Sequence, residues 1–109
     1  MKKYLIFDWG GTFLKFAEMN EFADILGKGK VETPKRTSDK QSFFQSIDAI
    51  VSQCNDIQGI AISSTGVIDS VHGVVQTIGA MPYLDGCQIC KEMEERYHVP
   101  ISIENDGKC

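Results

Sequence analysis

The stretch Asp8-Trp9-Gly10-Gly11-Thr12 decides the fold, because it connects two apolar runs through a pair of glycines. Residues 4–7 are apolar and precede it, and Leu14, Phe16 and Ala17 follow it closely. This pattern predicts a strand, a tight turn and a second strand. Two adjacent glycines let the backbone fold back sharply and leave its N–H groups open to a ligand, so the turn can form a concavity that binds an anion.

Polar side chains on both sides of the glycines extend this prediction. Asp8, at the expected strand end, can hold Mg²⁺ directly or through water, and Thr12 adds a hydroxyl donor. The stretch therefore indicates a turn that holds a phosphate and its metal. A plain hairpin with a surface aspartate is one alternative. The stretch also resembles the D-x-D-G-T of haloacid-dehalogenase-type phosphatases, but Gly10 stands where those enzymes have the aspartate that donates a proton.

Length and charge narrow the class of protein. The 109 residues suit one domain with a modest core, and the net charge of −4 gives no reason to expect nucleic acid or an anionic membrane as a partner. The apolar run after Lys2 and Lys3 is too short for a signal peptide, and no later run could span a bilayer. We therefore expect a cytoplasmic protein with free thiols.

Cys87 and Cys90 form a C-x-x-C motif. We interpret them as buried or half-buried cysteines of a helix rather than as a zinc or redox site.

Further elements follow from apolar periodicity. Residues 27–30 predict a turn, and Val31 begins an antiparallel third strand near the sheet edge. A helix follows, capped by Ser38 with Gln41; its apolar face comprises Phe43, Phe44, Ile47, Ile50, Val51 and Cys54. Residues 57–62 are apolar on both faces, which predicts a buried central strand parallel to the first.

The second half of the chain repeats this alternation. Residues 63–69 form a small-residue loop, residues 71–78 a hairpin-like excursion, and residues 80–84 a loop with exposed apolar side chains that could promote self-association. Asp85 can cap a second helix, which ends before Pro100. A short strand over residues 101–103 completes the order β-β-β-α-β-α-β, an α/β fold with a mixed sheet.

Three polar clusters follow the predicted strands. They are residues 8–12, residues 63–69, and Glu104-Asn105-Asp106. Because ligands of open α/β sheets bind beyond the carboxyl ends of strands, we expect the three clusters to share one cleft.

These residues resemble the ROK family of bacterial sugar kinases, open reading frames and repressors. The resemblance is carried by Asp8-x-Gly10-Gly11-Thr12 with Lys15, by Ser64-x-Gly66-x-x-Asp69, and by Glu104-Asn105-Asp106. It implies an RNase H-like domain of the actin/hexokinase-type ATPase superfamily. Residues 1–109 would form the N-terminal lobe of such a kinase, and the C-terminal lobe is absent from this chain.

The resemblance also implies roles for individual residues, with ATP and Mg²⁺ as cofactors and a sugar as substrate. Asp8 would order the magnesium-bound nucleotide, and Gly10, Gly11, Thr12 and Lys15 would contact the phosphates of ATP. Asp106 would be the general base that accepts a proton from the attacking sugar hydroxyl. Asn105 would bind sugar hydroxyls, and Gly66 would let the backbone approach the sugar.

The implied activity is transfer of the γ-phosphate of ATP to a sugar hydroxyl. A sugar-sensing regulator of the same fold without kinase activity is the alternative, and a homodimer is compatible with either. Relatives commonly have Asn-Leu in the loop before the second helix, where this chain reads Ala80-Met81-Pro82-Tyr83, so a sugar contact is lost or replaced. We expect the lobe alone to be inactive, because phosphoryl transfer needs both substrates aligned and shielded from water.

Overall fold

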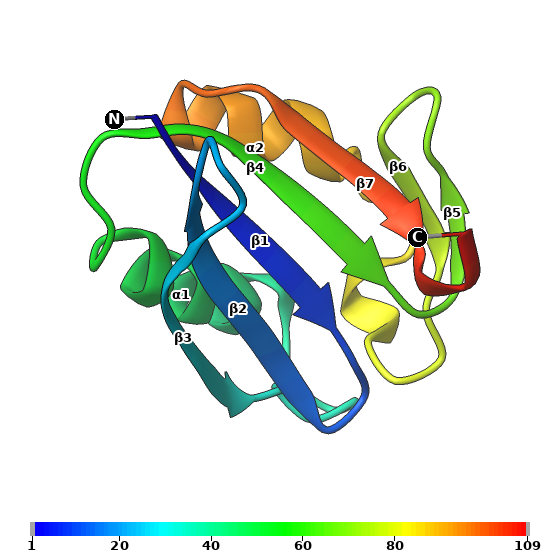
Figure 1. Cartoon of the computed structure of the whole chain (residues 1–109). Coiled ribbons are helices and arrows are strands. Elements are labelled where there is room, and N and C mark those ends of the chain that lie inside the picture. The colour runs from blue at the N-terminus through cyan, green and yellow to red at the C-terminus, as the bar shows by residue number, and fades with distance from the viewer. Residues whose placement is uncertain (1, 109) are drawn as a thin grey trace.

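The structure is a computed structural model that describes residues 2–108. The elements, in chain order (Figure 1), are β1 (Lys3–Trp9), β2 (Phe13–Asn20), β3 (Ile25–Glu32), α1 (Lys40–Val51), β4 (Ile57–Ser64), β5 (Val67–Asp69), β6 (Val74–Thr77), the 3₁₀ turn η1 (Pro82–Leu84), α2 (Ile89–Tyr97), β7 (Ile101–Asn105) and the 3₁₀ turn η2 (Asp106–Lys108). The predicted order is confirmed, and the 63–78 region contributes one more hairpin, β5–β6.

A five-stranded mixed sheet with the order β3-β2-β1-β4-β7 forms the centre of the molecule. The first three strands are antiparallel, whereas β1, β4 and β7 run parallel to one another. The sequence predictions of a central fourth strand parallel to the first and of an edge position for the third strand are both confirmed. β5 and β6 form a separate two-stranded sheet.

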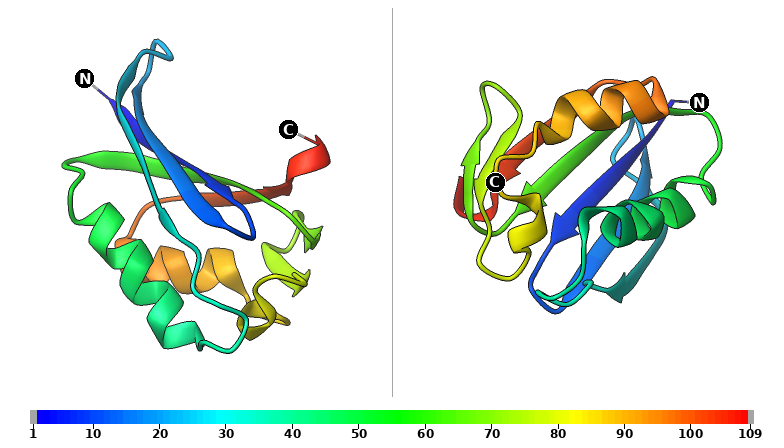
Figure 2. Two further views of the ribbon diagram at one scale, coloured as in Figure 1. Left: turned by 90° about the horizontal axis from the view of Figure 1, so that it is seen from below. Right: turned by 180° about the vertical axis from the view of Figure 1, so that it is seen from behind.

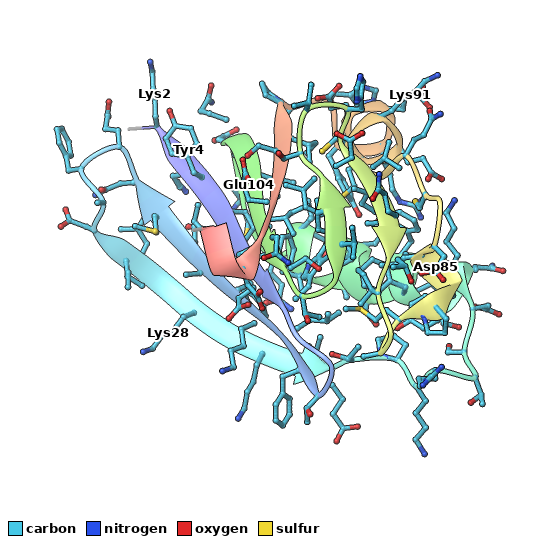
Figure 3. All side chains as sticks on the ribbon, turned by 90° about the vertical axis from the view of Figure 1, so that its right-hand side faces the viewer. Lys2, Tyr4, Lys28, Asp85, Lys91 and Glu104 are labelled. Carbon is cyan, nitrogen blue, oxygen red and sulfur yellow. The ribbon has the colours of Figure 1, made fainter. Side chains whose placement is uncertain are left out.

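Both long helices, α1 and α2, pack on the same face of this sheet, and neither covers the other face (Figure 2). The alternation along β1 explains the asymmetry. Leu5, Phe7 and Trp9 are fully buried and point toward the helices, while Tyr4 and Ile6 point the other way and stay partly exposed. Figure 3 shows the same division: Tyr4, Lys28 and Glu104 lie on the side without helices, which we call the open face, and Lys91 lies on the helix side.

The two helices are tied to each other as well as to the sheet. α1 buries Phe43, Phe44 and Ile47, as its periodicity predicts. Its neighbour α2 supplies Arg96, whose Nε and Nη2 each donate a 2.8 Å hydrogen bond to the Asp48 carboxylate on α1. The Arg96 guanidinium holds the pKa of Asp48 below its usual value. The prediction of a Ser38 cap was wrong by one residue: the cap is Asp39, whose Oδ1 accepts from the N–H of Ser42 at 2.8 Å.

The predicted turn at residues 27–30 was wrong, because this glycine-lysine segment lies within β3. A Cβ atom at Gly29 would come within 2.7 Å of the ring of Phe16 on the neighbouring strand, so the glycine makes room for this ring and does not form a turn. The true turn precedes Ile25. There the Asn20 side-chain oxygen accepts from the N–H groups of Phe22 and Asp24, which replaces the glycine signal expected of a turn.

The segment before α2 also differs from its prediction. Asp85 does not cap the helix; its Oδ1 accepts from the N–H of Ile78 at 3.0 Å, and α2 begins at Ile89 without a side-chain cap. Residues 80–84 were expected to be exposed, but Met81 and Leu84 are fully buried because η1 turns both into the core. This correction removes the loop as a reason for self-association.

The cysteines are free thiols among the described residues, and Cys54 and Cys90 are half-buried. Cys87 is buried but precedes α2 rather than lying within it. Burial, together with a hydrogen bond to Glu92, raises the pKa of Cys87 to about 12. Among residues 2–108, no helix combines the length and apolar character that crossing a membrane requires.

Candidate functional site

The three predicted polar clusters meet at one edge of the sheet. β1, β4 and β7 are adjacent and parallel, so their carboxyl ends point the same way (Figure 1). Asp8 pairs in register with Ser63, which pairs with Glu104 on the next strand. At the usual strand spacing, the backbones of Asp8 and Glu104 are separated by about 10 Å. The three clusters therefore lie at one edge of the sheet, and the shared cleft expected from the sequence stays a prediction.

The glycine turn presents unpaired backbone donors at this edge. The N–H of Gly10 closes the hairpin on the carbonyl of Phe13 at 3.0 Å. Within the described chain, no hydrogen bond uses the N–H of Gly11 or of Thr12, and both residues are exposed. Two free N–H groups and a hydroxyl are the donors that a phosphate oxygen needs, so the turn fits the predicted anion.

Asp8 and Lys15 lie opposite each other on β1 and β2 and face the open side of the sheet. They line part of an open groove of about 500 Å³ whose floor includes Ile6 and Ala17. Lys28 and Lys30 on β3 extend the positive charge along its side. The lining does not include Gly10, Gly11 or Thr12, so the groove borders the glycine turn without containing it.

Gly66 and Asn105 are joined directly, since the side-chain amide of Asn105 donates to the carbonyl of Gly66. Gly66 has a φ of +97°, and a Cβ atom there would lie 2.5 Å from the carbonyl oxygen of Thr77 on β6. The glycine is therefore required by the chain's own packing, and its predicted approach to a sugar stays a prediction. The contact fixes the β4–β5 connection against the end of β7.

Asp106 follows at the start of η2 and is exposed at the same edge. The N–H of Gly107 donates to the side-chain oxygen of Asn105 at 2.9 Å, which fixes the turn that carries Asp106. Asn105 thus orients the segment through both ends of its amide. The carboxylate of Asp106 is exposed at this edge, and its role as a general base stays a prediction.

Thr33 and Tyr83 support the glycine turn, and neither was predicted from the sequence to do so. The Thr33 hydroxyl donates to the carbonyl of Gly10 at 2.7 Å, and the Thr33 N–H donates to the carbonyl of Thr12 at 3.0 Å. The Tyr83 hydroxyl in turn donates to the carbonyl of Pro34 at 2.7 Å, and burial raises the pKa of Tyr83 to about 12. The signal in the sequence was weak: a threonine before a proline predicts extended backbone and no particular partner.

The opposite side of the turn contacts the segment before η1. A Cβ atom at Gly11 would lie 3.1 Å from the Cβ of Ala80, so a side chain at position 11 would need the two segments to shift slightly. In the described part of the chain, no three His, Cys, Asp or Glu side chains are grouped to hold a metal ion. Asp8 is the carboxylate at the turn and remains the predicted magnesium contact.

Other proteins resemble this chain in both sequence and fold. The ROK family model matches residues 4–109. A β-glucoside kinase from Klebsiella pneumoniae is 32% identical over 110 residues, covering 98% of this chain and 35% of that protein. A solved ROK family protein from Streptococcus pneumoniae in complex with sucrose matches with a TM-score of 0.84 and 30% identity, over 98% of this chain and 35% of the other.

A ROK family glucokinase from Streptomyces griseus, solved in complex with glucose and AMPPNP, has the same fold, with a TM-score of 0.81 at 24% identity over 95% of this chain and 33% of the other. The predicted α/β fold of the hexokinase type is thereby confirmed. The chain spans 35–38% of the length of the curated relatives that it matches. Because the family model covers almost every residue and the fold agrees, the chain belongs to the ROK family and represents its N-terminal portion.

Proposed function

We propose that the full-length protein is an ATP-dependent sugar kinase that transfers the γ-phosphate of ATP to a sugar hydroxyl. One observation carries the proposal: a turn with two unpaired N–H groups and the exposed carboxylate of Asp106 lie at the same edge of three parallel strands. Phosphoryl transfer requires mainly positioned donors for the phosphates and one carboxylate for the attacking hydroxyl. Relatives described as β-glucoside kinase and glucokinase support the same reaction.

The residues divide into three roles. Gly11 and Thr12 bind phosphate oxygens through their N–H groups, and Lys15 neutralises phosphate charge from β2. Asp8 holds Mg²⁺ through water, and the metal supplies charge stabilisation of the bound phosphates. Asp106 takes the proton of the attacking hydroxyl, and Asn105 binds the sugar while it fixes the turn that carries Asp106.

A kinase is favoured over a sugar-sensing regulator because the exposed carboxylate of Asp106, at the same edge as the glycine turn, supports the role of a base. A regulator needs the sugar contacts but has no use for the glycine turn and the base together. The lobe by itself is proposed to be inactive, since it offers one side of a site that must enclose both substrates.

The test is a coupled ADP-release assay on the full-length protein with β-glucosides, phosphorylated β-glucosides, hexoses and N-acetylhexosamines. Asp106→Asn keeps the size of the side chain and removes the base. We expect turnover to fall at least about a hundredfold while sugar binding is retained.

Asp56→Asn is the matched control, because Asp56 is exposed before β4, at the opposite end of the sheet from the site. Its backbone has a φ of +57°, which asparagine tolerates. Turnover near wild type in Asp106→Asn would disprove the role of this residue, and the absence of sugar-dependent ADP release from the wild-type protein would disprove the function.

A further inference from the structure

We propose that Thr33 is the positioning residue of the phosphate-binding turn: it holds the turn so that its N–H groups face the nucleotide. The inference rests on the proposed function only in that the turn binds the phosphates of a nucleotide. Thr33 lies just after β3, far from the turn in sequence, and is 8% exposed. Gly10 and Gly11 cannot take this role themselves, because glycines have no side chain to fix a peptide plane.

The geometry of the peptide group carries the argument. The carbonyl of Gly10 and the N–H of Gly11 belong to one planar trans peptide, so they point in opposite directions. The Thr33 hydroxyl fixes the orientation of this plane, because it donates to the Gly10 oxygen at 2.7 Å and keeps that oxygen turned inward. The Gly11 N–H is thereby directed outward, where no protein group uses it.

A second bond fixes the other end of the turn. The Thr33 N–H donates to the carbonyl of Thr12 at 3.0 Å, so one residue holds carbonyls on both sides of Gly11. Without these bonds, a pair of glycines would sample many backbone conformations, and ordering them on binding would cost affinity. Thr33 removes that cost before the nucleotide arrives.

Thr33 is itself held in place from the far side. Pro34 restricts the backbone that follows, and its carbonyl accepts from the Tyr83 hydroxyl at 2.7 Å. Tyr83 belongs to η1, which is anchored by the buried Met81 and Leu84. The turn is therefore positioned through Thr33 by the core of the domain and not by the flexible hairpin connection alone.

The experiment measures binding of Mg²⁺·AMPPNP to the full-length protein by titration calorimetry. Thr33→Val keeps the shape of the side chain and removes the hydroxyl, and Thr33→Ala removes it without a branched carbon. We expect both variants to weaken nucleotide binding about tenfold, the loss of roughly one hydrogen bond's worth of affinity. Thr33→Ser restores the hydroxyl and should bind as the wild type does.

Thr37→Val is the matched control, since Thr37 is exposed on the same connection and makes no side-chain hydrogen bond among the described residues. The calorimetric stoichiometry separates positioning from a purely structural role. Loss of folded protein lowers the number of sites and leaves the dissociation constant unchanged, whereas a misplaced turn raises the dissociation constant of every site.

Each outcome decides the matter. An unchanged dissociation constant in Thr33→Val and Thr33→Ala, or equal weakening in Thr33→Ser, overturns the proposal. A wild-type protein that binds no Mg²⁺·AMPPNP overturns both this proposal and the kinase function. A wild-type protein that binds the nucleotide but phosphorylates no sugar overturns only the kinase function, and the effect of the Thr33 variants on binding still tests the positioning role.

Discussion

The two faces of the central sheet are made from alternate residues of the same strands, yet they differ in what they do. On the helix side, the side chains of β1 and β4 are buried beneath α1 and α2. On the open face, β1, β2 and β7 present Asp8, Lys15 and Glu104, all exposed. The helix side therefore supplies the packing that stabilises the domain. The charged groups of the open face contribute little to that packing, so they are available to bind a ligand.

Truncation of neighbouring residues on β1 gives the sharpest test of this contrast. Phe7 is fully buried on the helix side, and Ile6 is partly exposed on the open face. We expect Phe7→Ala to lower the free energy of unfolding by about 3–5 kcal/mol, because it removes contacts and leaves a cavity. Ile6→Ala should lower the free energy of unfolding by less than about 1.5 kcal/mol, because the side-chain carbons that it removes are already partly exposed to solvent.

Urea unfolding of the two variants measures the difference directly. Equal losses at both positions would show that something covers the open face in solution and that the two faces are not distinct in stability.

Removal of the ion pair between Asp48 on α1 and Arg96 on α2 should have a smaller, pH-dependent effect on the free energy of unfolding. Arg96 lowers the pKa of Asp48, and the Tyr97 hydroxyl also donates to this carboxylate at 2.6 Å. A lowered pKa in the folded state means that the ionised carboxylate stabilises the fold above its ordinary value of 3.8, and that this stabilisation is lost as the pH falls through the folded value. Because Asp48 is 42% exposed, water screens the pair, and we expect Asp48→Asn to cost about 1 kcal/mol at pH 7.

Denaturation curves of wild type and Asp48→Asn between pH 7 and pH 2 provide the measurement. The gap between the two proteins should close below the ordinary aspartate range. A gap that persists at the acid end would mean that size or packing, and not charge, explains the loss.

The smallest effect on stability is expected on the open face, where the effect on binding should be larger. Lys15→Ala should change the free energy of unfolding by less than about 0.5 kcal/mol, as for other exposed side chains. It should weaken binding of Mg²⁺·AMPPNP to the full-length protein, because it removes a positive charge beside the glycine turn. Lys28→Ala, from the same groove but on β3, is the control. Equal binding losses in both variants would indicate a general field of the groove and not a contact by Lys15.

The sequence was informative where one residue type has one main reason to occur. The apolar run over residues 4–7 and the helical spacing of Phe43, Phe44 and Ile47 predicted a strand and a helix that the structure has. Glycines were harder to interpret, since Gly29 serves packing under Phe16 while Gly10 and Gly11 serve a turn. A polar residue before a helix was ambiguous in the same way: Asp85 bonds to Ile78 instead of capping α2.

The site likewise has one part that the sequence predicted and one part that it did not. Register and strand order place Asp8, the glycine turn and Asp106 at one edge, as the motif spacing predicted. The supports of that site could not be predicted, because Thr33 and Tyr83 act through single hydrogen bonds to carbonyls distant in sequence. Such bonds leave no periodic trace, and the burial of Met81 and Leu84 depends on a 3₁₀ turn that periodicity does not reveal.

The position of β1 within the sheet has a consequence for the order of folding. On one side β1 pairs with β2, which follows it at once, and the closing loop is short. On the other side it pairs with β4, which the chain reaches only after β3 and α1, and β7 must then join β4. Closing long loops costs more entropy and slows folding, so we expect the antiparallel hairpins to form before the parallel pairs. The bond from Asn105 to Gly66 needs β7 in place, so we expect the edge that carries Asp106 to be assembled late in folding.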